Sequence, residues 1–193
     1  MIAAQAFSFV VAGYESISSA LSFFFYNLAK NPDVQDKVRA EVVKSTADNP
    51  DDVYDAIAGM KYMEAAINES LRLYPPAGGI IRVCREDAVL ECGGRAMLEC
   101  GHQVIVPIQG IHRDPNHFPH PLLFDPDRFK ERTPRPGTFC PFGDGQRICI
   151  GQLNPILYRR CRRFKNYFTS TKQGATRVRF PKRSVLVESQ SGL

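Results

Sequence analysis

The amino-acid sequence predicts a single domain that is mainly α-helical and carries small antiparallel β-sheets. Residues 1–30 form a long apolar stretch without proline, and prolines at positions 32, 75 and 76 mark helix boundaries farther along. Beyond them the pattern changes to short, partly β-branched runs separated by glycines, which is typical of small strands. The 193 residues, 44% of them hydrophobic, suffice for the core of one domain.

Residues 1–30 are expected to form one long helix. Glu15 is the only charged residue before Lys30, so hydropathy alone would favour a membrane span. A carboxylate near the middle of a span costs on the order of 2.5 to 3.5 kcal/mol, however, and several serines dilute the apolar run. We therefore expect a helix of roughly 45 Å that is buried inside a sizeable protein.

A second helix is expected over residues 32–46. Asn31 can cap this helix, and Pro32 suits its first position. Its apolar residues recur every four positions, at Val34, Val38 and Val42. Turn signals follow at residues 48–52, and a short helix is expected near residues 53–58.

A third helix is expected over residues 61–74, where Pro75 and Pro76 stop it. It carries Glu69 and Arg72 three positions apart on one face, so their side chains can pair. Such pairs are common on exposed helices, where they contribute only about 0.2 to 1 kcal/mol. The spacing alone therefore indicates no function.

Four short strands are expected after the third helix. The two in the middle flank Gly93 and Gly94, a good hairpin turn that predicts an antiparallel pair. The expected strands span residues 80–84, 88–92, 95–100 and 103–108. The following residues, 110–141, are dense in proline and predict an irregular but ordered meander.

The histidines and cysteines do not indicate a dedicated metal site or a disulfide framework. His112, His117 and His120 lack metal-ligand spacing and are expected to be solvent-exposed loop residues. The six cysteines include no C-x-x-C pair and no zinc spacing. The net charge of +5 is modest and is partly concentrated over residues 159–165, which we expect to be a solvated face, so no nucleic-acid partner is expected.

Residues 142–151, with the sequence FGDGQRICIG, form the most informative motif of the chain. Phe142 supplies a flat aromatic ring, and the three glycines permit tight turns and the close approach of a planar group. Arg147 places a guanidinium two residues before Cys149. This combination predicts a cysteine thiolate that is placed to ligate a planar, anionic cofactor.

A second candidate motif lies within the first helix. Ala12 and Gly13 are small enough to let a cofactor or substrate press against the backbone, while Glu15 and Ser16 can relay protons through ordered water. The competing interpretation is a helix-packing notch beside a surface acid. The residues alone do not decide between the two.

The pattern Phe-x-x-Gly-x-Arg-x-Cys-x-Gly resembles the heme-binding loop of the cytochrome P450 family of heme-thiolate monooxygenases. The resemblance implies heme b as the cofactor and Cys149 as the ligand of its iron. The remaining cofactor-binding positions that it implies are Phe142, Gly143 and Gly151 and, against the heme propionates, Arg82 and Arg147.

Two further motifs resemble the same family. The segment Ala-Gly-Tyr-Glu-Ser is similar to its distal oxygen-binding motif, with serine in place of the more usual threonine. The catalytic positions so implied are Ala12, Gly13, Glu15 and Ser16. The segment Pro-Asp-Arg-Phe over residues 126–129 implies a buried, architectural triad around the heme. Its members are Glu69, Arg72 and Arg128.

The resemblance implies a monooxygenase that inserts one oxygen atom from O2 into a small lipophilic substrate. Electrons would come from an NADPH-dependent flavoprotein reductase, with cytochrome b5 as a further partner. The motifs are most similar to microsomal animal enzymes of xenobiotic-metabolising type, which implies the cytosolic face of the endoplasmic reticulum membrane. The match covers the C-terminal portion of the family's fold, as one domain over residues 1–193, so the family's N-terminal membrane anchor is expected to be missing here.

Two alternatives belong to other classes of function. The first is a truncated, non-catalytic fragment that cannot form a complete heme pocket. It is favoured by the expected truncation and by Pro155, which would cost about 3 kcal/mol in a helix interior where the family continues a helix. We expect local damage or mis-splicing between Gln152 and Asn166. The second is a relative that isomerises or dehydrates without external oxygen, and Glu15 and Ser16 argue against it.

Overall fold

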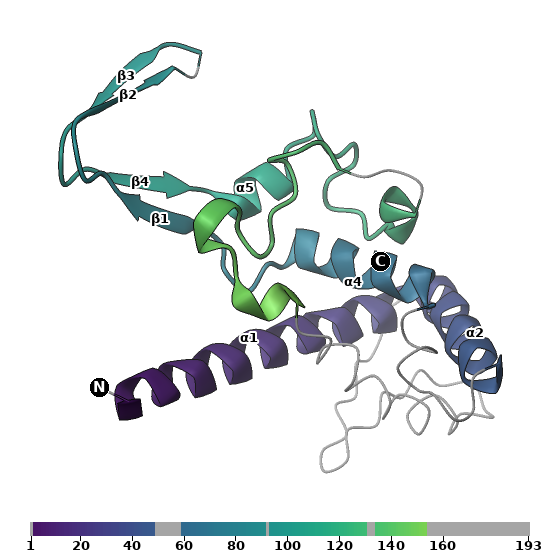
Figure 1. The fold of residues 1–193 in the computed structure, drawn as a ribbon. Coiled ribbons are helices and arrows are strands. Elements are labelled where there is room, and N and C mark those ends of the chain that lie inside the picture. Colours follow the sequence, from purple (N-terminus) through teal and green to yellow (C-terminus); the bar gives the residue numbers. More distant parts are fainter. Residues whose placement is uncertain (1, 49–58, 92, 131–133, 154–193) are drawn as a thin grey trace, which may run out of the picture.

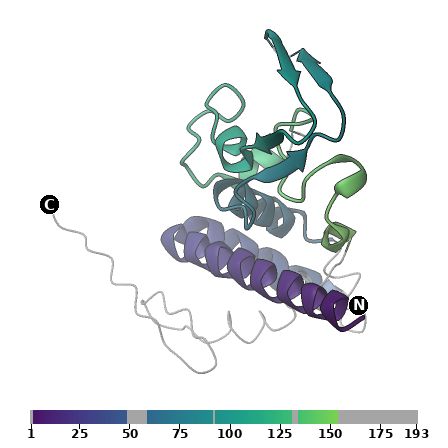
Figure 2. The same cartoon turned by 90° about the vertical axis from the view of Figure 1, so that its left-hand side faces the viewer.

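The computed structural model describes residues 2–48, 59–91, 93–130 and 134–153. Helix α4 lies between α1 and α2 on one side and the strands and meander on the other (Figures 1 and 2). The main helices are α1 (Ile2–Lys30), α2 (Pro32–Asp48) and α4 (Lys61–Leu73). The predicted fold class, mainly α-helical with small antiparallel sheets, is confirmed.

Helix α1 has its expected length, but only its C-terminal part is buried. Ala20, Phe24, Asn27 and Leu28 are buried, whereas residues 2–16 are exposed. The prediction of a helix buried along its length is therefore wrong in this structure, because the described part of the chain does not cover the first turns. By length and composition α1 is apolar enough to cross a membrane, a property that it shares with core helices of soluble proteins.

Polar and aromatic contacts fix α1 against α4. The side-chain amide of Asn27 donates to Ser70 Oγ at 3.1 Å within the buried interface. The ring of Phe23 stacks on that of Tyr74, with centroids 4.5 Å apart. A buried polar group left without a partner costs about 1 to 3 kcal/mol, so the amide–hydroxyl bond favours one register between the helices.

Helix α2 begins at Pro32 as predicted, and its three regularly spaced valines are buried in the core. The expected cap is different. The side-chain amide of Asn31 donates back to the carbonyl of Asn27 at 2.8 Å, and the main-chain amide of Asn31 donates to the same carbonyl at 3.1 Å. The short helix expected near residues 53–58 lies outside the described residues.

The predicted hairpin is present. Strand β2 (Ala88–Glu91) pairs with β3 (Arg95–Leu98) in antiparallel register, and Gly93 between them has a φ of +66°, which glycine adopts without a steric penalty. Figure 1 shows this hairpin projecting away from the helices.

A second two-stranded sheet joins β1 (Ile80–Val83) to β4 (Gln103–Val106), with the first residue of β1 opposite the last of β4. The sequence did not predict this pairing. The strand expected over residues 103–108 ends early, because Pro107 has no N–H to donate to the ladder. The chain turns instead into a short helix, α5 (Ile108–His112).

After α5 the chain is mostly irregular. Three short 3-10 turns interrupt the irregular path and the cysteine loop that follows it. They are η1 (Pro126–Phe129), η2 (Gly145–Arg147) and η3 (Ile150–Leu153). Among the described elements, η1 packs closely on α4.

Candidate functional site

The guanidinium of Arg72, on the buried face of α4, uses all five of its N–H donors. Nε donates to Glu69 Oε2 at 2.7 Å, and Nη2 donates to Oε1 at 2.8 Å. Nη1 donates to the carbonyls of His112 and Pro121, both at 2.8 Å, and Nη2 also donates to that of Leu123 at 3.2 Å. Arg72 thus forms a bidentate ion pair within α4 and also binds three main-chain carbonyls of the segment that follows β4.

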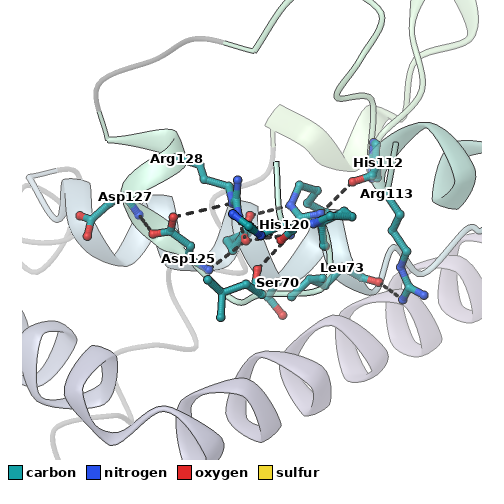
Figure 3. A network of polar contacts seen from close by, with 12 residues as sticks. Ser70, Leu73, His112, Arg113, His120, Asp125, Asp127 and Arg128 are labelled. Atoms are coloured by element: carbon teal, nitrogen blue, oxygen red, sulfur yellow. Dashed lines mark hydrogen bonds and ion pairs between the residues drawn. The ribbon is translucent and has the colours of Figure 1, made fainter. Parts of the chain in front are cut away.

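The carboxylate of Glu69 is also approached from the η1 segment. Its Oε1 accepts the amide hydrogen of Asp125 at 3.0 Å and lies 3.4 Å from Arg128 Nε. That second contact is an ion pair rather than a hydrogen bond, since Nε lacks a partner of good geometry. Arg128 instead donates through Nη2 to the carbonyl of His120 at 3.1 Å (Figure 3). Glu69, Arg72 and Arg128 therefore lie together, with Glu69 between the two arginines.

Burial makes this cluster expensive to break. Glu69 and Arg72 have no exposed surface. Removing a charge from water costs several kcal/mol per ion, which complete hydrogen bonding offsets here. The ring of Phe118 adds a cation–π contact, with its centroid 5.1 Å from the Arg72 guanidinium carbon. The physical effect of the cluster is to hold α4 against the meander.

His112 ends α5 and is completely buried, contrary to the exposed position expected for it. The helix packs on α4, which explains its burial. Nε2 accepts the amide hydrogen of Cys140 at 3.0 Å, so the ring is neutral and carries its proton on Nδ1. Burial lowers the pKa of His112 to about 4, and the positive charge of Arg72 acts in the same direction. Nδ1 has no hydrogen-bond partner among the described residues. His117 and His120 are exposed, as expected.

The loop that carries Cys149 folds back on itself. The amide of Cys149 donates to the carbonyl of Phe142 at 2.9 Å. Gly143 has a φ of +79°, and a Cβ there would lie 3.3 Å from Cδ1 of Ile80 on β1. A Cβ on Gly151 would lie 3.4 Å from the sulfur of Cys149. The thiol is exposed, with glycine backbone beside its sulfur.

The donor set of this loop fits a heme. Within the described ranges, no group of three or more His, Cys, Asp or Glu side chains is placed to hold a metal ion. A heme needs only one iron ligand from the protein, and the exposed Cys149 can supply it. Gly151 lies beside the Cys149 sulfur and has no side chain that would obstruct a flat cofactor. Burial raises the pKa of the Cys140 thiol, so that nearby cysteine stays protonated at neutral pH.

Two arginines expected to meet a cofactor's carboxylates are both exposed. Arg82 lies on β1, where its Nη1 donates to the carbonyl of Ile81 at 3.0 Å. Arg147 ends η2, whose start is capped by the Asp144 side chain. Neither guanidinium forms an ion pair with a residue that the structure describes, so both can meet an anionic group.

The distal motif lies in the exposed half of α1. Ser16 Oγ donates to the carbonyl of Ala12, one turn earlier, at 2.5 Å. Glu15 is exposed, and a Cβ on Gly13 would meet no atom within 4 Å. Among the described residues, no hydrogen bond or ion pair joins this motif to the Cys149 loop. Pro155 and the basic residues 159–165 lie outside the described residues.

Sequence reasoning missed the buried ring of His112 and the main-chain carbonyls that receive Arg72. The carbonyls carry no sequence signal, because any residue supplies one. For the histidine a weak signal existed. Ile108 and His112 are four residues apart, a helical spacing, and both are buried.

This chain is similar to known proteins over most of its length. The family model described as Cytochrome P450 matches residues 1–153. Cytochrome P450 3A29 of Sus scrofa is 41% identical over 159 residues, which cover 81% of this chain and 31% of that protein. Cytochrome P450 9e2 of Blattella germanica is 42% identical over 160 residues, covering 81% and 30%. Cytochrome P450 6a8 of Drosophila melanogaster is 41% identical over 154 residues, covering 78% and 30%. The chain spans about a third of the length of these curated relatives.

Proposed function

The chain belongs to the cytochrome P450 family, and from that premise we propose that it forms the thiolate side of a heme monooxygenase site around Cys149. The observation that carries the proposal is the geometry of the cysteine loop, whose thiol is exposed and has glycine backbone against its sulfur. When bound, a thiolate-ligated heme supplies the chemistry that cleaves O2 and places one oxygen atom in the substrate.

Each residue of the loop has a proposed task. Cys149 would hold the heme iron through its sulfur, and Gly151, which has no side chain, would leave that side of the sulfur clear. Phe142, partly buried against the core, supplies aromatic surface beside the cofactor. The exposed guanidinium groups of Arg82 and Arg147 would bind the propionates through charge-assisted hydrogen bonds.

The distal motif on α1 has a proposed role in proton delivery. Glu15 is an exposed carboxylate that can exchange protons with water. The hydroxyl of Ser16 donates its proton to the Ala12 carbonyl, and it would relay a proton only after turning away from that bond. Ala12 and Gly13 would leave room for substrate at the same turn because their side chains are small.

The wider setting is also part of the proposal. We propose a small lipophilic substrate, electrons from an NADPH-dependent flavoprotein reductase with cytochrome b5 as a further donor, and the cytosolic face of the endoplasmic reticulum membrane. Support comes from the similarity to animal cytochromes P450 named 3A29, 9e2 and 6a8. In this setting Glu69, Arg72 and Arg128 have an architectural role, which is supported by the burial of the first two.

A ligation test separates this function from a site that does not form. The 193-residue chain is loaded with heme, reduced and exposed to carbon monoxide, and its difference spectrum is recorded. We expect the long-wavelength band of thiolate ligation in the wild type and its loss in Cys149→Ser. Cys100→Ser removes another exposed thiol and should leave the band unchanged. A wild-type chain without the band, or a band that persists in Cys149→Ser, would contradict the proposal.

A further inference from the structure

His112 connects the buried Arg72 cluster to the Cys149 loop through both its main chain and its ring. Its carbonyl accepts from Arg72 Nη1 at 2.8 Å, and its Nε2 accepts the amide hydrogen of Cys140 at 3.0 Å. Resting on the proposed function, we propose that His112 is a positioning residue that sets the conformation of the Cys149 loop.

A short relay of hydrogen bonds leads from the ring to the cysteine. The amide of Cys140 donates to His112, and the carbonyl of Cys140 accepts from the amide of Gly143 at 3.0 Å. The carbonyl of Phe142 in turn accepts from the amide of Cys149 at 2.9 Å. Fixing Cys140 therefore fixes the turn at Gly143, and that turn orients the carbonyl that holds Cys149.

The ring is itself held rigidly. It packs against Phe139, with centroids 5.2 Å apart, and Phe139 packs against Phe129 of η1 at 4.7 Å. His112 has no exposed surface, so its ring has little freedom to rotate away from Cys140. The Arg72 guanidinium also fixes the main chain of His112, so this residue is anchored to α4 at its main chain and, through Phe139, to η1 at its ring.

Two properties of histidine are combined at this position. The position needs a flat apolar face for Phe139 and an acceptor at the far end of the side chain for Cys140. Phenylalanine keeps the face and loses the acceptor, leaving the Cys140 amide without its bond. Glutamine keeps an acceptor at the same number of bonds from Cβ and loses only the face. These two substitutions therefore separate positioning from packing.

The test follows the exchange rate of the Cys140 amide hydrogen by nuclear magnetic resonance in the heme-free chain. His112→Phe should exchange at least about tenfold faster than the wild type at this amide, the effect of one lost hydrogen bond. His112→Gln should restore most of the protection. His117→Phe, at an exposed histidine of the same segment, is the matched control and should change nothing. Wild-type exchange in His112→Phe would overturn the inference.

Folding of the variants is checked by helical circular dichroism. If His112→Phe fails to fold, His112→Gln decides alone, because unprotected Cys140 in a folded glutamine variant overturns the proposal and protected Cys140 supports it. The heme-loaded chains add a spectroscopic readout. We expect His112→Phe to lose part of the thiolate band and His112→Gln to regain it. A wild type that lacks the band would refute the proposed function, while the amide exchange would still decide the role of His112.

Discussion

At Arg72 the geometry explains why arginine in particular occupies the site. Its five donors meet two carboxylate oxygens and three carbonyls, and these acceptors come from both α4 and the meander. Lysine has three donors and no planar fork, so it could satisfy three of the five acceptors at most. The sequence predicted the pairing with Glu69 from its spacing. It could not predict the carbonyl partners, because their positions depend on how the irregular segment folds.

Replacing Arg72 by alanine should lower the free energy of unfolding by about 3 to 5 kcal/mol, since Glu69 would keep an uncompensated buried charge. Arg72→Lys restores the charge but not the fork, and an intermediate loss is expected. Chemical denaturation followed by circular dichroism measures both variants. We also expect Arg72→Ala to lose its heme. Arg85→Ala, at an exposed arginine, should stay within about 0.5 kcal/mol of the wild type. Wild-type stability and heme content in Arg72→Ala would contradict the architectural role.

The buried ring of His112 makes stability depend on pH. Its pKa is about 4 in the folded chain and close to 6.5 when unfolded. Between these values the unfolded chain binds a proton that the folded chain excludes. The contribution of the neutral ring is therefore fully present above pH 6.5 and is lost as the pH falls toward 4.

This loss is on the order of 2 kcal/mol at pH 5, relative to pH 7. The measurement is the difference in unfolding free energy between wild type and His112→Gln at pH 7, 6 and 5. Glutamine does not titrate, so the titrations that the two chains share cancel in the difference. A difference that stays constant over this range would mean that burial does not perturb the ring.

At the scale of elements, α4 receives its N-terminal cap from another helix. Its own N-cap residue, Met60, makes no side-chain cap. The carboxylate of Glu41 on α2 instead accepts the amide hydrogens of Tyr62 at 2.9 Å and Met63 at 2.8 Å. These are two of the first amides of α4 that lack helical partners, and a negative charge is favourable at that end.

Glu41→Ala should lower the free energy of unfolding by about 1 to 2 kcal/mol, because two amides lose charge-assisted bonds. Glu41→Gln keeps one acceptor oxygen and should lose less. The amide of Met63 should also exchange faster in the alanine variant, which places the effect at the start of α4. Glu86→Ala, at an exposed glutamate, is the control. Equal stability of Glu41→Ala and wild type would show that water caps the helix equally well.

The sequence predicts those elements whose signals lie within a few residues, and it misses those that depend on tertiary contacts. Pro32 and the regular valines predicted α2, and Pro75 predicted the end of α4, because these signals act within a few residues. The β2–β3 hairpin was predictable from its glycines for the same reason. The pairing of β1 with β4 was not, since it joins segments on either side of that hairpin and depends on tertiary contacts. The cap from Glu41 was missed for the same reason.

At the scale of the whole molecule, stability is concentrated around α4. Nine of its 13 residues are buried, and it contacts α1, α2, α5 and η1. The β2–β3 hairpin is largely exposed, and an isolated two-stranded hairpin is at best marginally stable in water. The first turns of α1 are exposed as well. Parts with few buried contacts open locally, without unfolding of the whole chain.

Hydrogen exchange should therefore separate α4 from the hairpin. We expect α4 amides to exchange only through global unfolding, so their rates should rise steeply with low concentrations of denaturant. Hairpin amides should exchange faster and with little denaturant dependence. Gly93→Ala strains a residue with a φ of +66° where no atom lies within 4 Å of the added Cβ, so it should speed exchange in the hairpin alone. Gly94→Ala, which has open space and no positive φ, is the matched control. If Gly93→Ala also speeds exchange in α4, the hairpin and the helical core unfold as one cooperative unit, and the stability gradient inferred from burial is wrong.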